Sequence, residues 1–85
     1  MKEFSYTIKD KVGIHARPAG LLVKEASKYN SEITIKKDEK CADAKKLFSV
    51  MSLVAKTGDT IKINISGEDE VGAEKGLKEF FENNL

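Results

Sequence analysis

The sequence is poor in the residues from which most metal, disulfide and cofactor sites are built. Its 85 residues include one cysteine, one histidine, one proline and no tryptophan. A single cysteine excludes a framework of internal disulfides and fits a reduced, cytoplasmic setting. One histidine and one cysteine cannot supply the usual ligand set of a zinc site, so we expect no metal and no cofactor. Cys41 is interpreted as a small apolar residue of a strand.

Long apolar runs and an excess of one charge are missing as well. The formal net charge is +1, and hydrophobic and charged residues make up 40% and 34% of the chain, as in soluble globular proteins. The longest nearly apolar run, LFSVMSLVA at 47–55, is too short to cross a bilayer, and the N-terminal segment has no apolar core of a secretory signal. We therefore expect one domain over residues 1–85, with no membrane insertion and no nucleic-acid partner.

Three segments alternate apolar and polar residues with the period of a half-buried strand. They are FSYTIKD at 4–10, EITIKK at 32–37 and TIKINIS at 60–66. A shorter strand at about 40–43 is predicted to pair with the second across a charged turn. Clean alternation favours an antiparallel sheet with one covered face.

Segments with helical periodicity lie between the strands. After Pro18, apolar residues recur at i, i+3, i+4 and i+7; a shorter helix is predicted over 46–55, and a third follows the last strand. The third helix has acidic residues at its start, and Gly72 and Gly76 are each expected to weaken it by roughly 1 kcal/mol relative to alanine. The order β-α-β-β-α-β-α predicts an α+β fold, an open-faced β-sandwich whose four-stranded antiparallel sheet is covered on one face by three helices.

The only histidine lies in GIHARPAGLL, at residues 13–22. Proline is favoured in the first turn of a helix, and the residue before proline is disfavoured in the helical conformation. A helix is therefore predicted to begin at about Pro18, with His15 and Ala16 in the loop before it. The first backbone N–H groups of such a helix have no intrahelical acceptor and bind anions, phosphate in particular.

His15 and Arg17 together form a candidate site for phosphoryl transfer. An imidazole with a pKa near 6.5 is substantially neutral at physiological pH, and its free nitrogen can attack phosphorus and carry the phosphoryl group. Arg17 can hold the phosphoryl oxygens in a fork, with the backbone N–H groups of Ala16 and Arg17 as further donors. The alternative is that His15 is an ordinary polar loop residue. A catalytic triad is disfavoured because no serine or cysteine with a paired carboxylate stands near His15.

The segment at 46–55 holds more apolar side chains than one core-facing stripe of a helix can bury. They are Leu47, Phe48, Val50, Met51, Leu53 and Val54. Those expected to fill the core are Val50, Leu53 and Val54. For Phe48, Met51 and also Leu21, which lies opposite the core face of its helix, the pattern leaves core packing and docking to a partner protein equally open.

GIHARPAG at 13–20 followed by VMSL at 50–53 resembles the bacterial HPr phosphocarrier family of the sugar phosphotransferase system. The match covers the whole chain in length, element order and motif spacing. The resemblance implies that His15 accepts a phosphoryl group on Nδ1 from phosphorylated Enzyme I, which draws it from phosphoenolpyruvate, and passes it to the IIA domains of sugar transporters. It implies a carrier rather than an enzyme, with Arg17 as the active-site arginine and Pro18 as the helix-opening proline.

The resemblance also assigns a docking surface. The residues at positions that match the family's partner-binding surface are Gly20, Leu21, Leu47, Phe48 and Met51. This favours docking for the surplus apolar side chains. Because both partners must reach the same imidazole, they are expected to bind one at a time and weakly, to a chain that is itself a monomer.

Lys46 departs from many Gram-positive members of that family, which carry a regulatory serine there, phosphorylated by a dedicated kinase. Lysine cannot form that stable phosphate ester, so serine-based control at this site is predicted to be absent. Ser49 and Ser52 remain candidate substitutes. The alternative interpretation is that Lys46 is an ordinary solvated surface lysine.

Two other functions were compared with the sugar phosphocarrier. A paralogue in a nitrogen-linked or regulatory phosphorelay stays open, although the sequence keeps the histidine that such a regulator sometimes lacks. A small RNA-binding module is disfavoured by the near-zero net charge and by the lack of aromatic pairs on the central strands.

Overall fold

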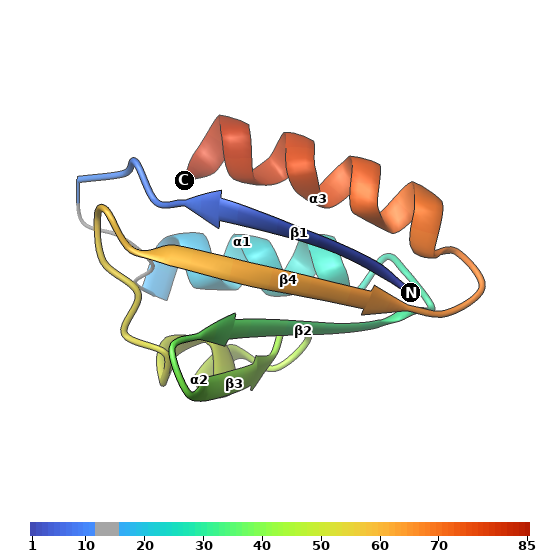
Figure 1. Ribbon diagram of the computed structural model, residues 1–85, viewed down its shortest axis with the longest axis horizontal. Helices are drawn as coiled ribbons and strands as arrows, with labels where there is room; N and C mark the ends of the chain where they lie inside the picture. The colour runs from blue at the N-terminus through green and yellow to red at the C-terminus, as the bar shows by residue number, and fades with distance from the viewer. Residues whose placement is uncertain (12–15) are drawn as a thin grey trace.

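The computed structural model describes residues 1–11 and 16–85, so the prediction for His15 lies outside the described residues. The elements follow the predicted order (Figure 1). They are β1 (Lys2–Thr7), α1 (Ala16–Ala26), β2 (Glu32–Lys37), β3 (Lys40–Asp43), α2 (Leu47–Met51), β4 (Thr60–Ser66) and α3 (Glu70–Asn84).

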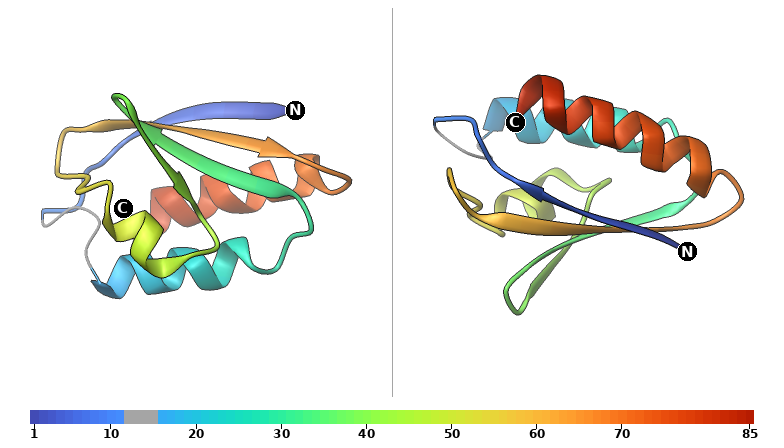
Figure 2. Two further views of the ribbon diagram at one scale, coloured as in Figure 1. Left: turned by 90° about the horizontal axis from the view of Figure 1, so that it is seen from below. Right: turned by 45° about the horizontal axis from the view of Figure 1, so that its top comes forward.

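The four strands form one antiparallel sheet in the order β1-β4-β2-β3. In this register Ile63 of β4 lies opposite Phe4 of β1 on one side and Ile35 of β2 on the other. Buried isoleucines alternate along β4 with polar residues such as Lys62, so one face of the sheet is apolar and the other is polar. All three helices lie on the apolar face (Figure 2), and the predicted α+β open-faced sandwich is confirmed.

The buried apolar side chains form one cluster between the sheet and the helices. The largest fully buried members are Phe81, Ile8, Leu22, Ile35, Leu53, Ile61, Ile63, Ile65, Leu77 and Val50. Phe81 of α3 is stacked on the sheet, with its ring centroid 6.1 Å from that of Phe4 and 5.3 Å from that of Tyr6. Three residues of the predicted apolar stripe of α1, namely Ala19, Leu22 and Ala26, are buried in the same cluster, and Val23 packs partly against it.

The second helix is shorter than the pattern predicted. α2 ends at Met51, whereas a helix was expected over 46–55. Leu53 is buried as expected, but Val54 is 51% exposed, so the prediction that Val54 fills the core is wrong. Val54 adopts a left-handed backbone conformation with φ of 51°, which ends a right-handed helix and takes this residue out of the core-facing stripe.

The first helix begins two residues earlier than predicted, at Ala16 rather than Pro18. Pro18 is therefore the third residue of α1, where its missing N–H costs nothing because the first four N–H groups of a helix have no intrahelical acceptor. The preference of Arg17 for an extended conformation before proline is a bias that the helix overrides. The first strand also ends earlier, at Thr7 rather than at residue 10, although Ile8 remains buried.

Asp69 joins the turn after α1 to the start of α3. Its carboxylate accepts hydrogen bonds from Ser31 Oγ at 2.5 Å and from the backbone N–H groups of Asn30 and Ser31 at 2.8 and 3.0 Å. These donors, the Ser31 hydroxyl first, hold the pKa of Asp69 below its usual value. Gly67 passes so close to this turn that a Cβ there would lie 2.6 Å from Ser31 Cα. Close backbone approach therefore requires glycine at this position.

Candidate functional site

The N-terminal end of α1 places Arg17, Pro18 and Leu21 on one rim of a shallow groove. His15 lies outside the described residues, and the chain is described again from Ala16, the residue that follows it. Arg17 is exposed while Pro18 is buried, so the proline fixes the helix start against the body of the protein and the guanidinium faces solvent. Ala16 and Arg17 are in the first turn of α1, where backbone N–H groups have no intrahelical acceptor.

The groove forms where three distant parts of the chain meet. It has a volume of about 280 Å³, and its lining residues are Asp10, Arg17, Pro18, Leu21, Asn83 and Asn84. The segment after β1 is fixed beside the last turn of α3, because the N–H groups of Lys9 and Asp10 donate to the Leu85 carbonyl at 2.6 and 2.8 Å. The Thr57 hydroxyl donates to the Asp10 carbonyl from the other side. Sequence reasoning missed Asp10, Asn83 and Asn84, because no local pattern shows which ends of the strands and helices lie together in the fold.

The predicted docking residues divide into two groups. Phe48 is 82% exposed and Leu21 is 44% exposed, so neither of them fills the core. Leu47 and Met51 are half-buried and pack partly against the core. Gly20 is half-buried, and a Cβ there would meet no atom within 4 Å. The two helices that carry these five residues, α1 and α2, lie beside each other (Figure 2).

Lys46 precedes the first residue of α2 and is exposed. Its backbone is extended and no side chain caps this helix end. The two nearby serines are occupied within the fold. Ser49 Oγ accepts from the Asp43 N–H at 2.9 Å, and Ser52 Oγ donates to the Ser49 carbonyl at 2.6 Å. Both hydroxyls therefore take part in local hydrogen bonds, and the role of either serine as a substitute site stays a prediction.

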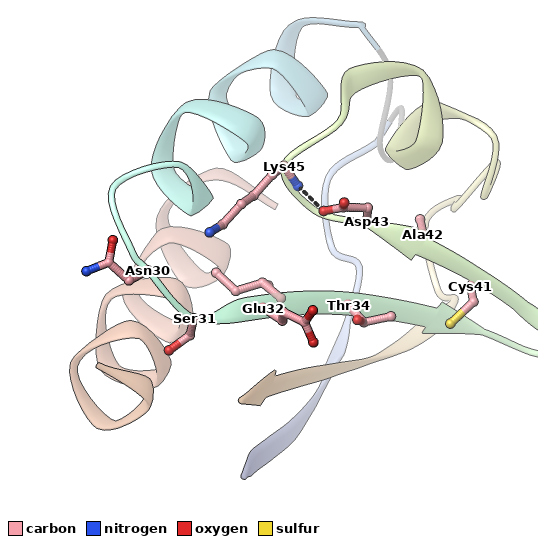
Figure 3. A pocket seen from close by; sticks show the side chains of 9 residues that line it. Asn30, Ser31, Glu32, Thr34, Cys41, Ala42, Asp43 and Lys45 are labelled. Carbon is pink, nitrogen blue, oxygen red and sulfur yellow. Dashed lines mark hydrogen bonds between the residues drawn. The ribbon is translucent and has the colours of Figure 1, made fainter. Parts of the chain in front are cut away.

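A second pocket lies at the other end of α1, beside β2 and β3 (Figure 3). It has a volume of about 370 Å³, and its lining residues are Asn30, Ser31, Glu32, Ile33, Thr34, Cys41, Ala42, Asp43 and Lys45. Lys45 donates two hydrogen bonds: its ammonium donates to the Tyr29 carbonyl at 2.6 Å, and its backbone N–H donates to Asp43 Oδ1 at 2.9 Å. Cys41 lies in β3, as expected, with its side chain exposed.

Two kinds of site are absent from the part of the chain that the structure describes. Among residues 1–11 and 16–85, no group of three or more histidine, cysteine, aspartate or glutamate side chains could hold a metal ion. Over the same ranges, no helix combines the length and the hydropathy that crossing a membrane requires.

Known proteins resemble this chain over nearly its full length. A family model described as the PTS HPr component phosphorylation site matches residues 2–83. The phosphocarrier protein HPr of Mycoplasma capricolum is 47% identical over 79 residues, which cover 93% of this chain and 89% of the relative.

Solved structures agree. A mycoplasma protein described as the histidine-containing phosphocarrier protein has a TM-score of 0.93 at 44% identity, covering 96% of this chain and 93% of that one. Crh of Bacillus subtilis, described as a catabolite repression protein and as a dimer with a swapped domain, has a TM-score of 0.78 at 34% identity, covering 94% and 92%. With a family model and a curated relative both matched over most of its length, the chain belongs to the HPr family of phosphocarrier proteins of the phosphotransferase system.

Proposed function

We propose that this protein is the phosphocarrier of a phosphoenolpyruvate-dependent sugar phosphotransferase system and that His15 carries the phosphoryl group. The observation that carries the proposal is the family match over residues 2–83, which includes the GIHARPAG segment and the only histidine. Phosphorylated Enzyme I donates the group, and the IIA domains of sugar transporters accept it.

The transfer is a substitution at phosphorus. The Nδ1 lone pair of neutral His15 attacks, an N–P bond forms, and the bond to the donor atom breaks with its electron pair left on Enzyme I. The phosphoryl oxygens are held by the Arg17 guanidinium and by the first N–H groups of α1, those of Ala16 and Arg17. The reverse substitution on a IIA domain returns the imidazole unchanged, so the protein acts as a carrier and not as an enzyme.

Both partners dock on one surface made by α1 and α2. Its residues are Gly20, Leu21, Leu47, Phe48 and Met51. The exposure of Leu21 and Phe48 supports this assignment, because large apolar side chains in solvent are costly unless a partner covers them. The missing side chain at Gly20 leaves room for a partner's close approach. Enzyme I and a IIA domain therefore exclude each other, which gives a shuttle.

The protein works as a cytoplasmic monomer without serine-based control at residue 46. Lys46 supports the second point, since an ammonium cannot form a stable phosphate ester. The monomeric state needs a test, because a relative, Crh of Bacillus subtilis, is a swapped dimer. Sedimentation or size-exclusion chromatography over a range of concentrations measures it. A concentration-independent mass of one chain is expected, and a stable dimer would contradict it.

A regulatory phosphorelay is the second candidate function. The likeness to Crh, which is described as a catabolite repression protein, favours it. The two functions differ in the acceptor, so transfer from the phosphorylated chain to sugar-specific IIA domains supports uptake. Transfer to nitrogen-linked IIA domains alone supports the relay.

Incubation with phosphoenolpyruvate, magnesium and Enzyme I tests the carrier assignment. We expect one acid-labile, alkali-stable phosphate per chain, with a phosphorus NMR shift typical of a phosphoimidazole. His15→Ala should abolish the label, and labelling that survives this change would refute the proposal.

Arg17→Glu tests the charge partner in the same assay. Transfer should slow strongly while the unfolding temperature stays unchanged, because Arg17 is exposed. Lys75→Glu makes the same charge change at an exposed residue of α3 and serves as the control. Equal rates for the two variants would exclude a specific role for Arg17.

A further inference from the structure

The residues directly after β1 line the groove of the candidate site and are fixed by hydrogen bonds from two sides. Ile8 exchanges two bonds with the loop before β4: its N–H donates to the Asp59 carbonyl at 2.9 Å, and its carbonyl accepts from the Gly58 N–H at 2.9 Å. The next two N–H groups, at positions 9 and 10, donate to the Leu85 carbonyl. Because all of these bonds join backbone groups, they survive replacement of a side chain.

Thr57 adds a bond of a different kind to the same segment. Its hydroxyl donates to the Asp10 carbonyl, although the two residues are 47 positions apart in the chain. A donor bonds a carbonyl oxygen best near the plane of the peptide group. Thr57 therefore fixes the orientation of the peptide group that follows Asp10, and with it the direction in which the chain leaves this residue.

The turn that carries Thr57 is itself fixed by hydrogen bonds. The Asp59 N–H donates to the Lys56 carbonyl at 2.9 Å, and the Asp59 carboxylate accepts from the Lys56 N–H at 2.8 Å. Lys37 of β2 pairs with the same carboxylate at 3.1 Å. Gly58 supplies the φ of 90° in this turn. Because the Thr57 side chain is exposed, its hydroxyl contributes a directed bond and not core packing.

Asp10 forms part of the groove beside Arg17. It comes from the segment after β1, whereas Arg17 and Pro18 come from the start of α1. The energy between a carboxylate and a guanidinium depends on their separation, so a shift of Asp10 changes the electrostatic field at Arg17. Phosphoryl transfer depends on positioning and on charge stabilisation. Such a shift should therefore slow transfer without removing any group that contacts the phosphoryl oxygens.

We propose that Thr57 is a positioning residue for phosphoryl transfer, whose hydroxyl fixes the Asp10 peptide group and thereby the wall that Asp10 contributes to the groove beside Arg17. The proposal rests on the function proposed above. Thr57 acts through Asp10, and its hydroxyl bond involves none of the docking residues on α1 and α2.

Thr57→Val tests this role, because it removes the hydroxyl and keeps a branched side chain of similar size. It should lower kcat for labelling of the chain by Enzyme I about three- to tenfold, the effect of one lost hydrogen bond. KM should stay nearly unchanged, because the docking residues are intact. Thr57→Ser keeps the hydroxyl and should return kcat to within about twofold of the unaltered protein. In NMR spectra, the Arg17 amide resonance should move in Thr57→Val and not in Thr57→Ser.

Thr60→Val is the matched control, since it makes the same chemical change at a hydrogen bond that does not involve Asp10. The Thr60 and Thr7 hydroxyls are bonded to each other at 2.9 Å, between β4 and β1. This variant should keep the kcat and the Arg17 amide resonance of the unaltered protein, even where its unfolding temperature falls as far as that of Thr57→Val.

The kinetic constants separate positioning from other roles. An unchanged kcat for Thr57→Val, with the unaltered protein still labelled at His15, overturns the positioning role and leaves the proposed function intact. An equal loss of kcat in Thr60→Val shows a general loosening of the fold, and a rise of KM alone shows a direct contact with Enzyme I; either result also overturns the inference. If Enzyme I fails to label the unaltered chain, the proposed function fails first and the inference falls with it.

Discussion

At the scale of single residues, two glycines four positions apart on α3 have opposite consequences. Gly72 is exposed, and a Cβ there would meet nothing within 4 Å, whereas a Cβ on Gly76 would lie 1.9 Å from Tyr29 Oη and 3.0 Å from Tyr29 Cζ. Helix propensity alone assigns both the same cost, as the sequence predicted. The structure shows that Gly76 makes room for the tyrosine that packs between α1 and α3.

The two alanine substitutions should therefore shift stability in opposite directions. Gly72→Ala should raise the free energy of unfolding by roughly 0.5–1 kcal/mol, because alanine is the better helix former. Gly76→Ala should lower it despite the same gain in propensity, because the new methyl group overlaps the Tyr29 hydroxyl. Urea unfolding measures both. Tyr29→Phe should restore part of the loss in the Gly76→Ala background, and two equal stabilisations would contradict the packing argument.

Lys46 gives a prediction at the same scale. Treatment with HPr kinase and ATP should leave no stable phosphoserine, because the matching position holds an amine, which cannot form a stable phosphate ester. The measurement is mass spectrometry after an acid step, which removes phosphohistidine and preserves phosphoserine. Lys46→Ser is the positive control, and a phosphorylated Ser49 or Ser52 in the unaltered chain would overturn the prediction.

Residue chemistry was only partly predictable from the sequence. Counting apolar positions against the width of one helical stripe showed a surplus of apolar side chains in the second helix but left the burial of Phe48 open, and the structure shows that Phe48 is exposed. The exposure of Val54 did not, because it depends on one backbone angle that periodicity does not specify. The contact between Gly76 and Tyr29 also could not be predicted, since it joins two helices whose packing is set by the whole fold.

At the scale of elements, Asp69 couples the end of α1 to the start of α3. Its carboxylate is stabilised in the charged form by the Ser31 hydroxyl and by the Asn30 N–H, which lower its pKa. Because the pKa of Asp69 is lower in the folded state, its carboxylate stabilises the fold at pH values above the pKa of the unfolded state, which is near 3.8. That contribution is lost as the pH falls through the still lower pKa of the folded state.

Asp69→Asn should therefore unfold at a lower temperature than the unaltered protein at pH 7. The difference should shrink as the pH falls below about 4, because protonation removes the same charge from the unaltered protein. Thermal unfolding at a series of pH values measures this. Asp38→Asn, a change of the same kind on the exposed turn between β2 and β3, is the control. A difference that is constant with pH would show that the charge of Asp69 is not what stabilises the turn.

The exposed face of α2 should matter for docking and not for folding. Phe48→Ala should leave the unfolding temperature nearly unchanged, since the side chain is 82% exposed. It should raise KM for transfer from Enzyme I, because an aromatic anchor at an interface is lost. Val71→Ala on α3 is the matched control, and a large loss of stability in Phe48→Ala would contradict the docking assignment.

The order and type of the elements were predictable, because strand alternation and helical spacing are local patterns. Element ends were less so. α1 starts earlier than the bias against helix before proline predicted, and α2 stops earlier than its apolar run predicted, owing to Val54. In both cases the backbone preference of one residue competes with the helical preference of its neighbours. The structure shows which of the two preferences determines where the helix begins or ends.

At the scale of the whole molecule, we propose that residues 1–85 form a single domain that unfolds as one unit. One apolar cluster joins the sheet to all three helices, and Phe81 lies within it against Phe4 and Tyr6 of β1. A domain of this size has only about 5–15 kcal/mol of stability, so the loss of one large core side chain is a sizeable fraction of the total.

Phe81→Ala should lower the free energy of unfolding by about 3–5 kcal/mol. Circular dichroism and tyrosine fluorescence should report one coincident transition for this variant and for the unaltered protein. Two separated transitions would contradict a single domain.

The groove beside Arg17 belongs to this largest scale and could not be predicted from the sequence. Arg17 was found from its place next to His15 and Pro18, which is local information. Asp10 and Asn84 lie beside it only because the segment after β1, the start of α1 and the end of α3 meet at one corner of the molecule. Which elements lie together at the groove depends on strand order and helix packing, and a short sequence motif carries no information about either.

The position of Cys41 has a practical consequence. It is exposed on β3, and because its neighbour Ala42 faces the core, the thiol lies on the side of the sheet that no helix covers. A maleimide dye attached there would leave α1 and α2 clear while staying within energy-transfer range of anything that settles on them. The protein's lone sulfhydryl thus offers a built-in handle for watching individual molecules meet and leave their partners in real time.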